Sequence, residues 1–176
     1  MNKDIVLTEL QIDEIKKTAD KERRKFGIID APIAGDLFML LEQEGIAICQ
    51  YPFLTSEKSH TDANITRFET GSDQMIFIGL NTAIYYDEQI FALAHELYHY
   101  ITQTGKAYET DMDEEDKRTE KMADRFAAEL LLPSEILNHM IIEQFKTSCL
   151  KKVSDHRLLR FIARLQSEWW LPYRAL

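Results

Sequence analysis

Two histidines four residues apart, inside an apolar stretch, restrict what this chain can fold into more than any other feature. Residues 90 to 101 read IFALAHELYHYI and contain the pattern His95-Glu96-x-x-His99. On an α-helix, residues four apart project from one face a turn apart, so both imidazoles can bind one metal ion. Glu96 then lies beside the metal without being a ligand, where it can accept a proton from water. The pattern predicts the active helix of a zinc hydrolase.

The alternative interpretation is a helix that simply carries two histidines along its polar edge. The residues around the pattern are apolar on most sides of the expected helix, so the histidines and Glu96 should be largely buried. Polar groups buried without partners are costly, and one metal ion would satisfy all of them together. The apolar context therefore favours the metal site.

A third protein ligand is expected on another helix, because two imidazoles and a water leave tetrahedral zinc one ligand short. The best candidate is Glu120, in the segment 120–130, which reads EKMADRFAAEL. Asp124 lies one helical turn later on the same face, where it can accept the free ring N–H of one of the two histidines. Ala123 and Ala127 are small enough for two helices to approach closely. The alternative is that the two acids form the solvated edge of a helix.

Three segments together resemble the ImmA/IrrE family of metallopeptidases. They are a strand ending in asparagine at 76–81 (IFIGLN), the histidine helix at 91–100 (FALAHELYHY), and the segment 120–133 (EKMADRFAAELLLP). The resemblance covers about residues 30 to 140. One departure from the family pattern is Tyr98, where the family generally has glycine, and a bulky ring there is expected to narrow the cleft.

The resemblance implies a zincin-like site in which each residue has a defined role. The implied metal ligands are His95, His99 and Glu120, and the implied general base is Glu96. It also implies a narrow substrate, a helix-turn-helix transcriptional repressor cleaved once to release expression of phage, mobile-element or stress genes. Zinc is the expected metal, although two imidazoles and a carboxylate also suit Mn²⁺ or Fe²⁺.

The alternation of apolar segments and turns predicts an α+β fold with one small antiparallel sheet packed against helices. Strands are expected at 46–51, 65–69 and 75–80, the last two forming a hairpin through the turn-rich residues between them. We expect the whole chain, 1–176, to form a single metallopeptidase domain. Its core should span about residues 30–140, followed by a C-terminal helical extension at about 146–176.

The strand before the histidine helix is the expected substrate-binding strand. In zincin-like folds such a strand runs along the cleft, and a free edge can pair with an extended peptide. Ile76, Ile78 and Asn81 are the candidate substrate-binding residues on it. The alternative is that both edges of this strand are covered internally.

The candidates for stabilising a negatively charged oxygen during peptide hydrolysis are three tyrosines near the histidines. Tyr98, Tyr100 and Tyr108 are all close enough in sequence to be considered, and nothing in the sequence chooses among them.

Composition restricts the partners and the compartment. The net charge of −9 argues against direct binding to nucleic acid and favours a basic partner. The two cysteines, Cys49 and Cys149, lie far apart and are expected to be reduced thiols in a cytoplasmic protein. We expect no membrane-spanning segment and no signal peptide.

Two other functions use the same residues. One is a non-cleaving, metal-containing regulator that binds a repressor or an antitoxin, and the other is a metal-dependent toxin of a toxin–antitoxin pair. The complete set His95, Glu96, His99 and Glu120 counts against a vestigial site, because a hydrophobic residue could replace Glu96 in a structural role. The sequence does not separate the toxin from the repressor-cleaving protease.

Overall fold

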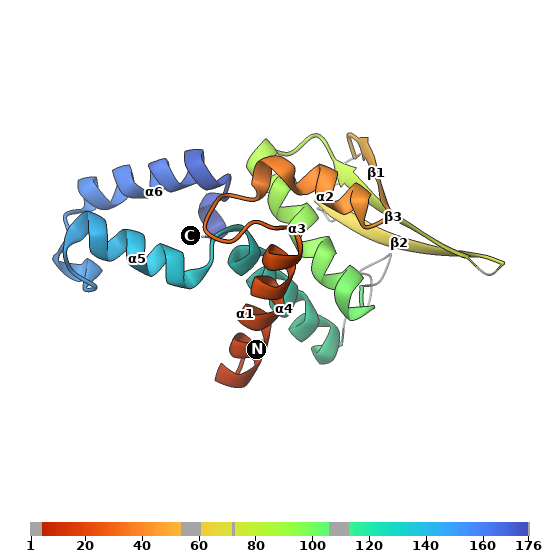
Figure 1. The fold of residues 1–176 in the computed structure, drawn as a ribbon, viewed down its shortest axis with the longest axis horizontal. Coiled ribbons are helices and arrows are strands. Elements are labelled where there is room, and N and C mark those ends of the chain that lie inside the picture. The colour runs from red at the N-terminus through yellow and green to blue at the C-terminus, as the bar shows by residue number, and fades with distance from the viewer. Residues whose placement is uncertain (1–4, 54–60, 72, 106–112, 176) are drawn as a thin grey trace.

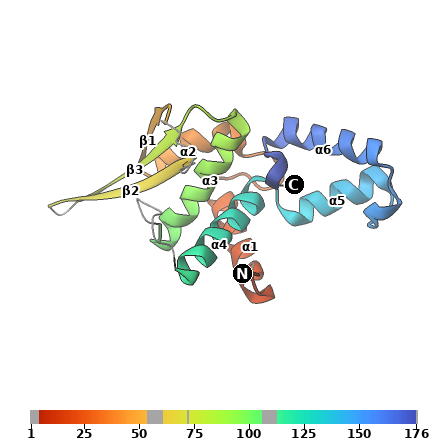
Figure 2. The same ribbon diagram turned by 180° about the vertical axis from the view of Figure 1, so that it is seen from behind.

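The computed structural model describes residues 5–53, 61–71, 73–105 and 113–175, and it has the expected α+β architecture (Figure 1). Helices surround one face of a three-stranded sheet, and two C-terminal helices lie together at the end opposite the β2–β3 hairpin (Figure 2). The helices are α1 (Glu9–Lys25), α2 (Leu37–Gln43), α3 (Tyr86–Thr102), α4 (Glu114–Leu131), α5 (Ser134–Phe145) and α6 (Asp155–Trp169). The strands are β1 (Ile46–Tyr51), β2 (Ala63–Thr70) and β3 (Asp73–Asn81).

The sheet is mixed, so the prediction of an antiparallel sheet is wrong in one pairing. β2 and β3 form the expected antiparallel hairpin, but β1 pairs with β3 in parallel, which gives the order β1-β3-β2. A tight turn holds β2 beside β3, whereas the eleven residues 52–62 between β1 and β2 do not require those two strands to be neighbours. β3 is the central strand, so both of its edges are paired.

Helix α3 lies at the centre of the molecule, between the sheet and α4 (Figure 1). Its apolar residues explain this position, because Ile90, Leu93, Ala94 and Leu97 are each at most 1% exposed. A surface helix would place polar residues on one side, and a helix that is apolar on most sides must be buried. The helix is capped by Tyr85 at its start and by Gln103, in the left-handed conformation, at its end.

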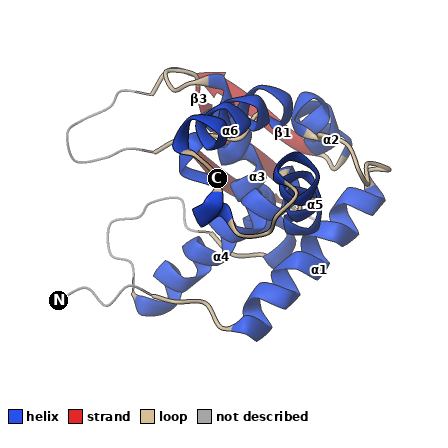
Figure 3. Cartoon of the chain, turned by 90° about the vertical axis from the view of Figure 1, so that its left-hand side faces the viewer, coloured by secondary structure: helices blue, strands red, loops and turns tan. Residues whose placement is uncertain are grey.

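Helix α4 packs against both α3 and α1, and α1 and α4 lie below α3 in Figure 3. The predicted capping box starts α1, where Thr8 and Gln11 satisfy each other's backbone amides. The α1 residue Arg23 is 2% exposed, and its guanidinium donates to the carbonyls of Leu130, Ile29 and Ala31. This buried cation therefore fixes α1 to the end of α4.

The end of the chain packs through one of its two adjacent tryptophans. Trp169 of α6 is 5% exposed, whereas Trp170 is 42% exposed and lies edge-on to Tyr86 at 5.0 Å between ring centroids. No helix in the described part of the chain has both the length and the apolar composition needed to span a membrane.

Candidate metal centre

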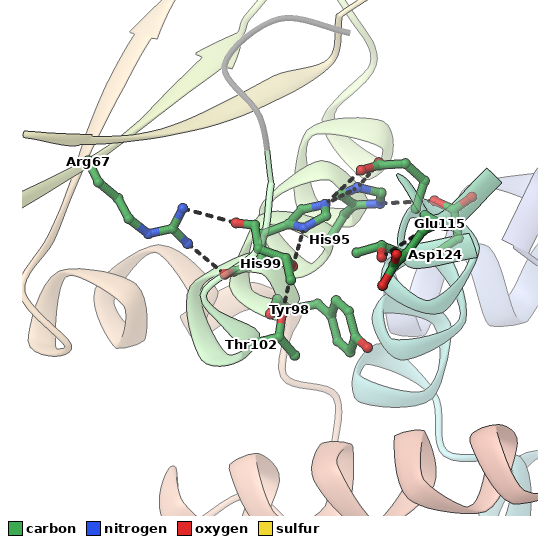
Figure 4. Close-up of polar contacts among 10 residues, drawn as sticks. Arg67, His95, Tyr98, His99, Thr102, Glu115 and Asp124 are labelled. Carbon is green, nitrogen blue, oxygen red and sulfur yellow. Dashed lines mark hydrogen bonds and ion pairs between the residues drawn. The ribbon is translucent and has the colours of Figure 1, made fainter. Parts of the chain in front are cut away.

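Helix α3 places the two histidines and Glu96 next to α4, which carries Glu120 and Asp124 (Figure 4). His99 is 2% exposed and Glu96 is 7% exposed, so both lie inside the fold. The apolar face of α3 is thus buried together with these polar groups, as the sequence context predicts.

The side chains of His95, His99 and Glu120 converge on one point. His95 Nε2 lies 3.0 Å from a Glu120 carboxylate oxygen, His99 Nε2 lies 3.3 Å from the other oxygen, and the two Nε2 atoms are 3.1 Å apart. All three ligand atoms lie within 4.8 Å of one another. Tetrahedral zinc with bonds of about 2.1 Å separates neighbouring ligand atoms by about 3.4 Å. The donor set and its spacing therefore fit a small divalent cation.

Asp124 binds the ring nitrogen of His95 that faces away from Glu120. Its carboxylate oxygen lies 3.0 Å from His95 Nδ1, on the side of the ring opposite Glu120, so the contact expected for one of the two histidines is present. Burial lowers the pKa of His95, but hydrogen bonds to the Asp124 and Glu120 carboxylates outweigh it and raise that pKa to about 10. Without a metal, His95 is therefore held as a cation between two acids.

Glu120 has the complementary electrostatics. Burial raises the pKa of its carboxyl group, but hydrogen bonds from His95 and His99 outweigh burial and lower the pKa to about 2. Glu120 is therefore ionised at every physiological pH, as a metal ligand must be.

Glu96 lies beside this cluster without belonging to it. Burial is the main reason that the pKa of Glu96 is raised, and the neighbouring imidazoles oppose the shift. The backbone amide of Ile65 in β2 also donates a hydrogen bond to the Glu96 carboxylate. A buried carboxylate with a raised pKa is suited to take and release a proton near neutral pH.

An open cleft of about 660 Å³ gives access to the cluster. Residues of α3 and α4 form its walls, with residues 5–7 at one side and 61–63, at the start of β2, at another. Lys121 Nζ donates to the carbonyl of Ile5 at 2.6 Å and so fastens the N-terminal segment to α4. The cleft therefore lies between two extended backbone segments.

The tyrosines considered as oxyanion donors are not brought to this cleft where the structure describes them. The Tyr98 ring packs on Phe126 at 5.4 Å between centroids and lies edge-on to the His99 ring at 6.1 Å, but it does not line the cleft. The Tyr100 hydroxyl donates to the carbonyl of Glu44 at 3.5 Å. Tyr108 lies outside the described residues.

The expected substrate strand is β3, and its edges are both occupied. Ile76 and Ile78 pair with β1 on one side and with β2 on the other, so the prediction of a free edge on this strand is wrong. Asn81 is 1% exposed, and its side chain accepts from the amides of Phe53 and Ala83. Asn81 therefore holds the loops that flank the sheet.

The outer edge of β2 takes the place expected for β3. Ile65 reaches Glu96 through its backbone amide, and Ala63 lines the cleft. A sequence motif consists of side chains, so the contact made by the backbone amide of Ile65 could not be predicted before the strand order was known.

With this geometry in view, the chain belongs to the family described as the IrrE N-terminal-like domain, Peptidase_M78, whose model matches residues 41–163. The match includes α3, α4 and the whole candidate metal centre. It confirms the family resemblance that the sequence motifs indicate.

A solved structure described as a Mycobacterium tuberculosis transcriptional regulator has a similar fold, with a TM-score of 0.55 and 13% sequence identity. The match covers 93% of this chain and 44% of the regulator, so this chain spans less than half of that protein. At this identity the likeness shows the fold alone. A comparison with curated proteins finds no significant match.

Proposed function

We propose that this protein is a zinc-dependent endopeptidase in which His95, His99 and Glu120 bind the metal and Glu96 is the general base. The observation that carries the proposal is the convergence of two imidazole Nε2 atoms, 3.1 Å apart, on the Glu120 carboxylate, whose two oxygens lie 3.0 Å and 3.3 Å from them; these are the donor types that zinc prefers, at a spacing that suits one small cation. Membership of a peptidase family supports the reaction class.

Zinc bound there supplies a Lewis acid that polarises the scissile carbonyl and makes water a better nucleophile. Glu96 has the two properties that a general base requires. Its pKa is raised by burial, and its carboxylate borders the cleft, so it can hold a proton and then pass it to the leaving amine. Asp124 holds the His95 ring so that Nε2 faces the metal position.

The outer edge of β2 is the proposed docking strand for an extended peptide. An added strand pairs its backbone groups with a free sheet edge, and the start of β2 lines the cleft beside Glu96. A substrate paired along Ala63 would therefore pass its backbone in front of the catalytic residues.

The proposed substrate is a protein, specifically a helix-turn-helix repressor whose cleavage releases transcription. Two observations support it: the family, and a fold shared with a protein described as a transcriptional regulator. The proposed site of action is the cytoplasm, and zinc is the proposed metal, with Mn²⁺ and Fe²⁺ as the ions against which it should be compared.

The test is Glu96→Gln, a nearly isosteric change that removes the base and leaves the three ligands. The variant should bind one zinc per chain like the wild type, and it should retain an intact protein partner that the wild type releases as fragments. Glu42→Gln, an exposed acid on α2, is the matched control and should cleave normally. The same partner retained intact by the wild type and by Glu96→Gln would contradict proteolysis and support the non-cleaving regulator.

A further inference from the structure

We propose that Thr104 is a positioning residue for the second histidine: its hydroxyl accepts from His99 Nδ1–H and so forces the Nε2 lone pair toward the metal. This inference rests on the proposed metal role of His99. Thr102 determines that the Thr104 hydroxyl accepts rather than donates in this contact, and Arg67 holds the backbone of Thr104 in place.

The direction follows from counting hydroxyl protons along a chain of hydrogen bonds. The Thr102 hydroxyl donates to the Tyr98 carbonyl at 2.8 Å, which uses its single proton. The two threonine hydroxyls are 2.6 Å apart, so the proton between them must come from Thr104. Thr104 Oγ1 then has only lone pairs left for His99 Nδ1, which lies 3.0 Å away.

His99 must therefore be the donor in that contact, with its proton on Nδ1. The neutral imidazole carries one N–H and one lone pair, so a proton on Nδ1 leaves Nε2 as the acceptor or metal-binding atom. Nε2 is the ring atom that lies 3.3 Å from Glu120 and 3.1 Å from His95 Nε2. The hydroxyl chain thus selects the tautomer that the metal site needs.

The backbone around Thr104 is fixed by a cation from β2. One Arg67 nitrogen donates to the His99 carbonyl at 2.6 Å and another donates to the Thr104 carbonyl at 2.9 Å (Figure 4). The Thr104 amide also donates to the His99 carbonyl at 3.1 Å. These three bonds therefore hold the Thr104 backbone against the last turn of α3.

Gly105 allows the chain to pass this close to the ring. Its φ is +90°, and a Cβ atom built there would lie 3.1 Å from His99 Cβ and Cγ. A side chain would push the segment away from the histidine and lengthen the Thr104 contact. The loop after α3 is thus shaped around His99.

The two histidines are supported by different chemistry. His95 Nδ1 faces the carboxylate of Asp124, which is 62% exposed, whereas His99 Nδ1 faces a half-buried neutral hydroxyl. An ionised carboxylate can only accept a hydrogen bond, whereas a hydroxyl can also donate, so the Thr104 hydroxyl acts as an acceptor toward His99 only if its own proton is donated elsewhere. Thr102 has that function.

The test compares Thr104→Val with Thr104→Ser in the full chain, using zinc alone as the probe. Valine keeps the shape of threonine and removes the hydroxyl, whereas serine keeps the hydroxyl. Thr104→Val should bind zinc about 10- to 100-fold more weakly in competition with a chromogenic chelator, because ligand-supporting partners have effects of this size. Thr104→Ser should bind close to the wild-type value.

The tautomer is the readout that a purely structural role would not change. In metal-free protein His99 Nε2 also faces the Glu120 carboxylate at 3.3 Å, so the expected signature of the Thr104 contact is a protonated Nδ1 in the ¹⁵N spectrum of the wild-type ring and of Thr104→Ser, whether or not Nε2 carries a proton as well. The spectrum of Thr104→Val should show a smaller Nδ1–H population, and that of Thr102→Val should do the same because the Thr104 hydroxyl is then free to donate.

Equal zinc affinity of Thr104→Val and the wild type, or an unchanged His99 tautomer, would overturn the inference. A failure of the wild type to bind zinc would instead overturn the proposed function, and the tautomer in metal-free protein would still decide the role of Thr104. The two failures are therefore distinguishable.

Discussion

Zinc binding should release a proton from His95, which makes the affinity strongly dependent on pH. The pKa of His95 in the metal-free protein is raised to about 10, although burial opposes the shift, because the Asp124 and Glu120 carboxylates accept its two N–H groups. At pH 7 only about one molecule in a thousand then carries a neutral His95. Zinc must compete with that proton, so the apparent affinity should rise about tenfold per pH unit between pH 7 and 8.5.

Asp124→Asn separates the proton effect from other consequences of pH. The amide keeps an oxygen near His95 Nδ1 but removes the charge that helps to hold the proton, so the pKa of His95 should fall. The slope of log affinity against pH should therefore be shallower in Asp124→Asn than in the wild type. Asp155→Asn, an exposed acid on α6, is the control and should keep the wild-type slope.

The assay is competition for zinc with a chelator of known pH dependence, together with calorimetry in buffers of different ionisation enthalpy to count released protons. The expected count for the wild type is close to one at pH 7 to 8.5. An affinity that does not change with pH over this range, with no proton released, would refute the reasoning, because His95 would then already be neutral in the metal-free protein.

The remaining predictions concern the metal-free fold. Because the pKa of His95 is raised from 6.5 to about 10, its protonation stabilises the metal-free fold. This stabilisation is fully present below pH 6.5 and is lost as the pH rises through about 10. Thermal unfolding of metal-free protein should therefore move to lower temperature between pH 7 and 10, and a constant midpoint would contradict the assignment. Phe126→Ala should lower the free energy of unfolding, measured with urea, by about 3–5 kcal/mol. The reason is that Phe126 is 0% exposed and packs on Tyr98. Arg23→Met should destabilise the protein by several times the effect of the exposed Arg24→Met, since it leaves the buried Leu130 carbonyl and the partly buried carbonyls of Ile29 and Ala31 without their donor.

The candidate metal centre could be predicted because its chemistry depends on helical spacing. His95 and His99 are one turn apart on α3, Glu120 and Asp124 are one turn apart on α4, and both patterns survive small errors in the helix ends. The helix ends themselves were less predictable. The Glu88 carboxylate accepts from the backbone amide of Tyr85 at 3.2 Å, and this contact helps to set the start of α3.

The strand order could not be predicted from strand patterns. The alternation of residues locates β1 and β3 but carries no information about which strands become neighbours, and the connection 52–62 allows more than one order. The prediction of a free edge on β3 failed for this reason. The strand edge that borders the cleft could be assigned to β2 only after the three strands were placed.

The support of His99 gave no signal in the sequence. Thr104 is a single threonine after a helix, and Arg67 is a single arginine in a strand, so neither stands at a spacing that indicates a site. They meet His99 because β2 packs against the end of α3. Contacts that depend on tertiary packing become visible only in the folded chain.

The most direct measurement of the central claim is X-ray absorption spectroscopy of the zinc-loaded protein, with Glu120→Ala measured beside it. The account predicts one zinc per chain bound by two imidazole nitrogens and one carboxylate oxygen, with weaker binding in the variant. Zinc bound through the sulfur of Cys49 or Cys149, or bound equally well by Glu120→Ala, would contradict the assignment of His95, His99 and Glu120 as the metal site.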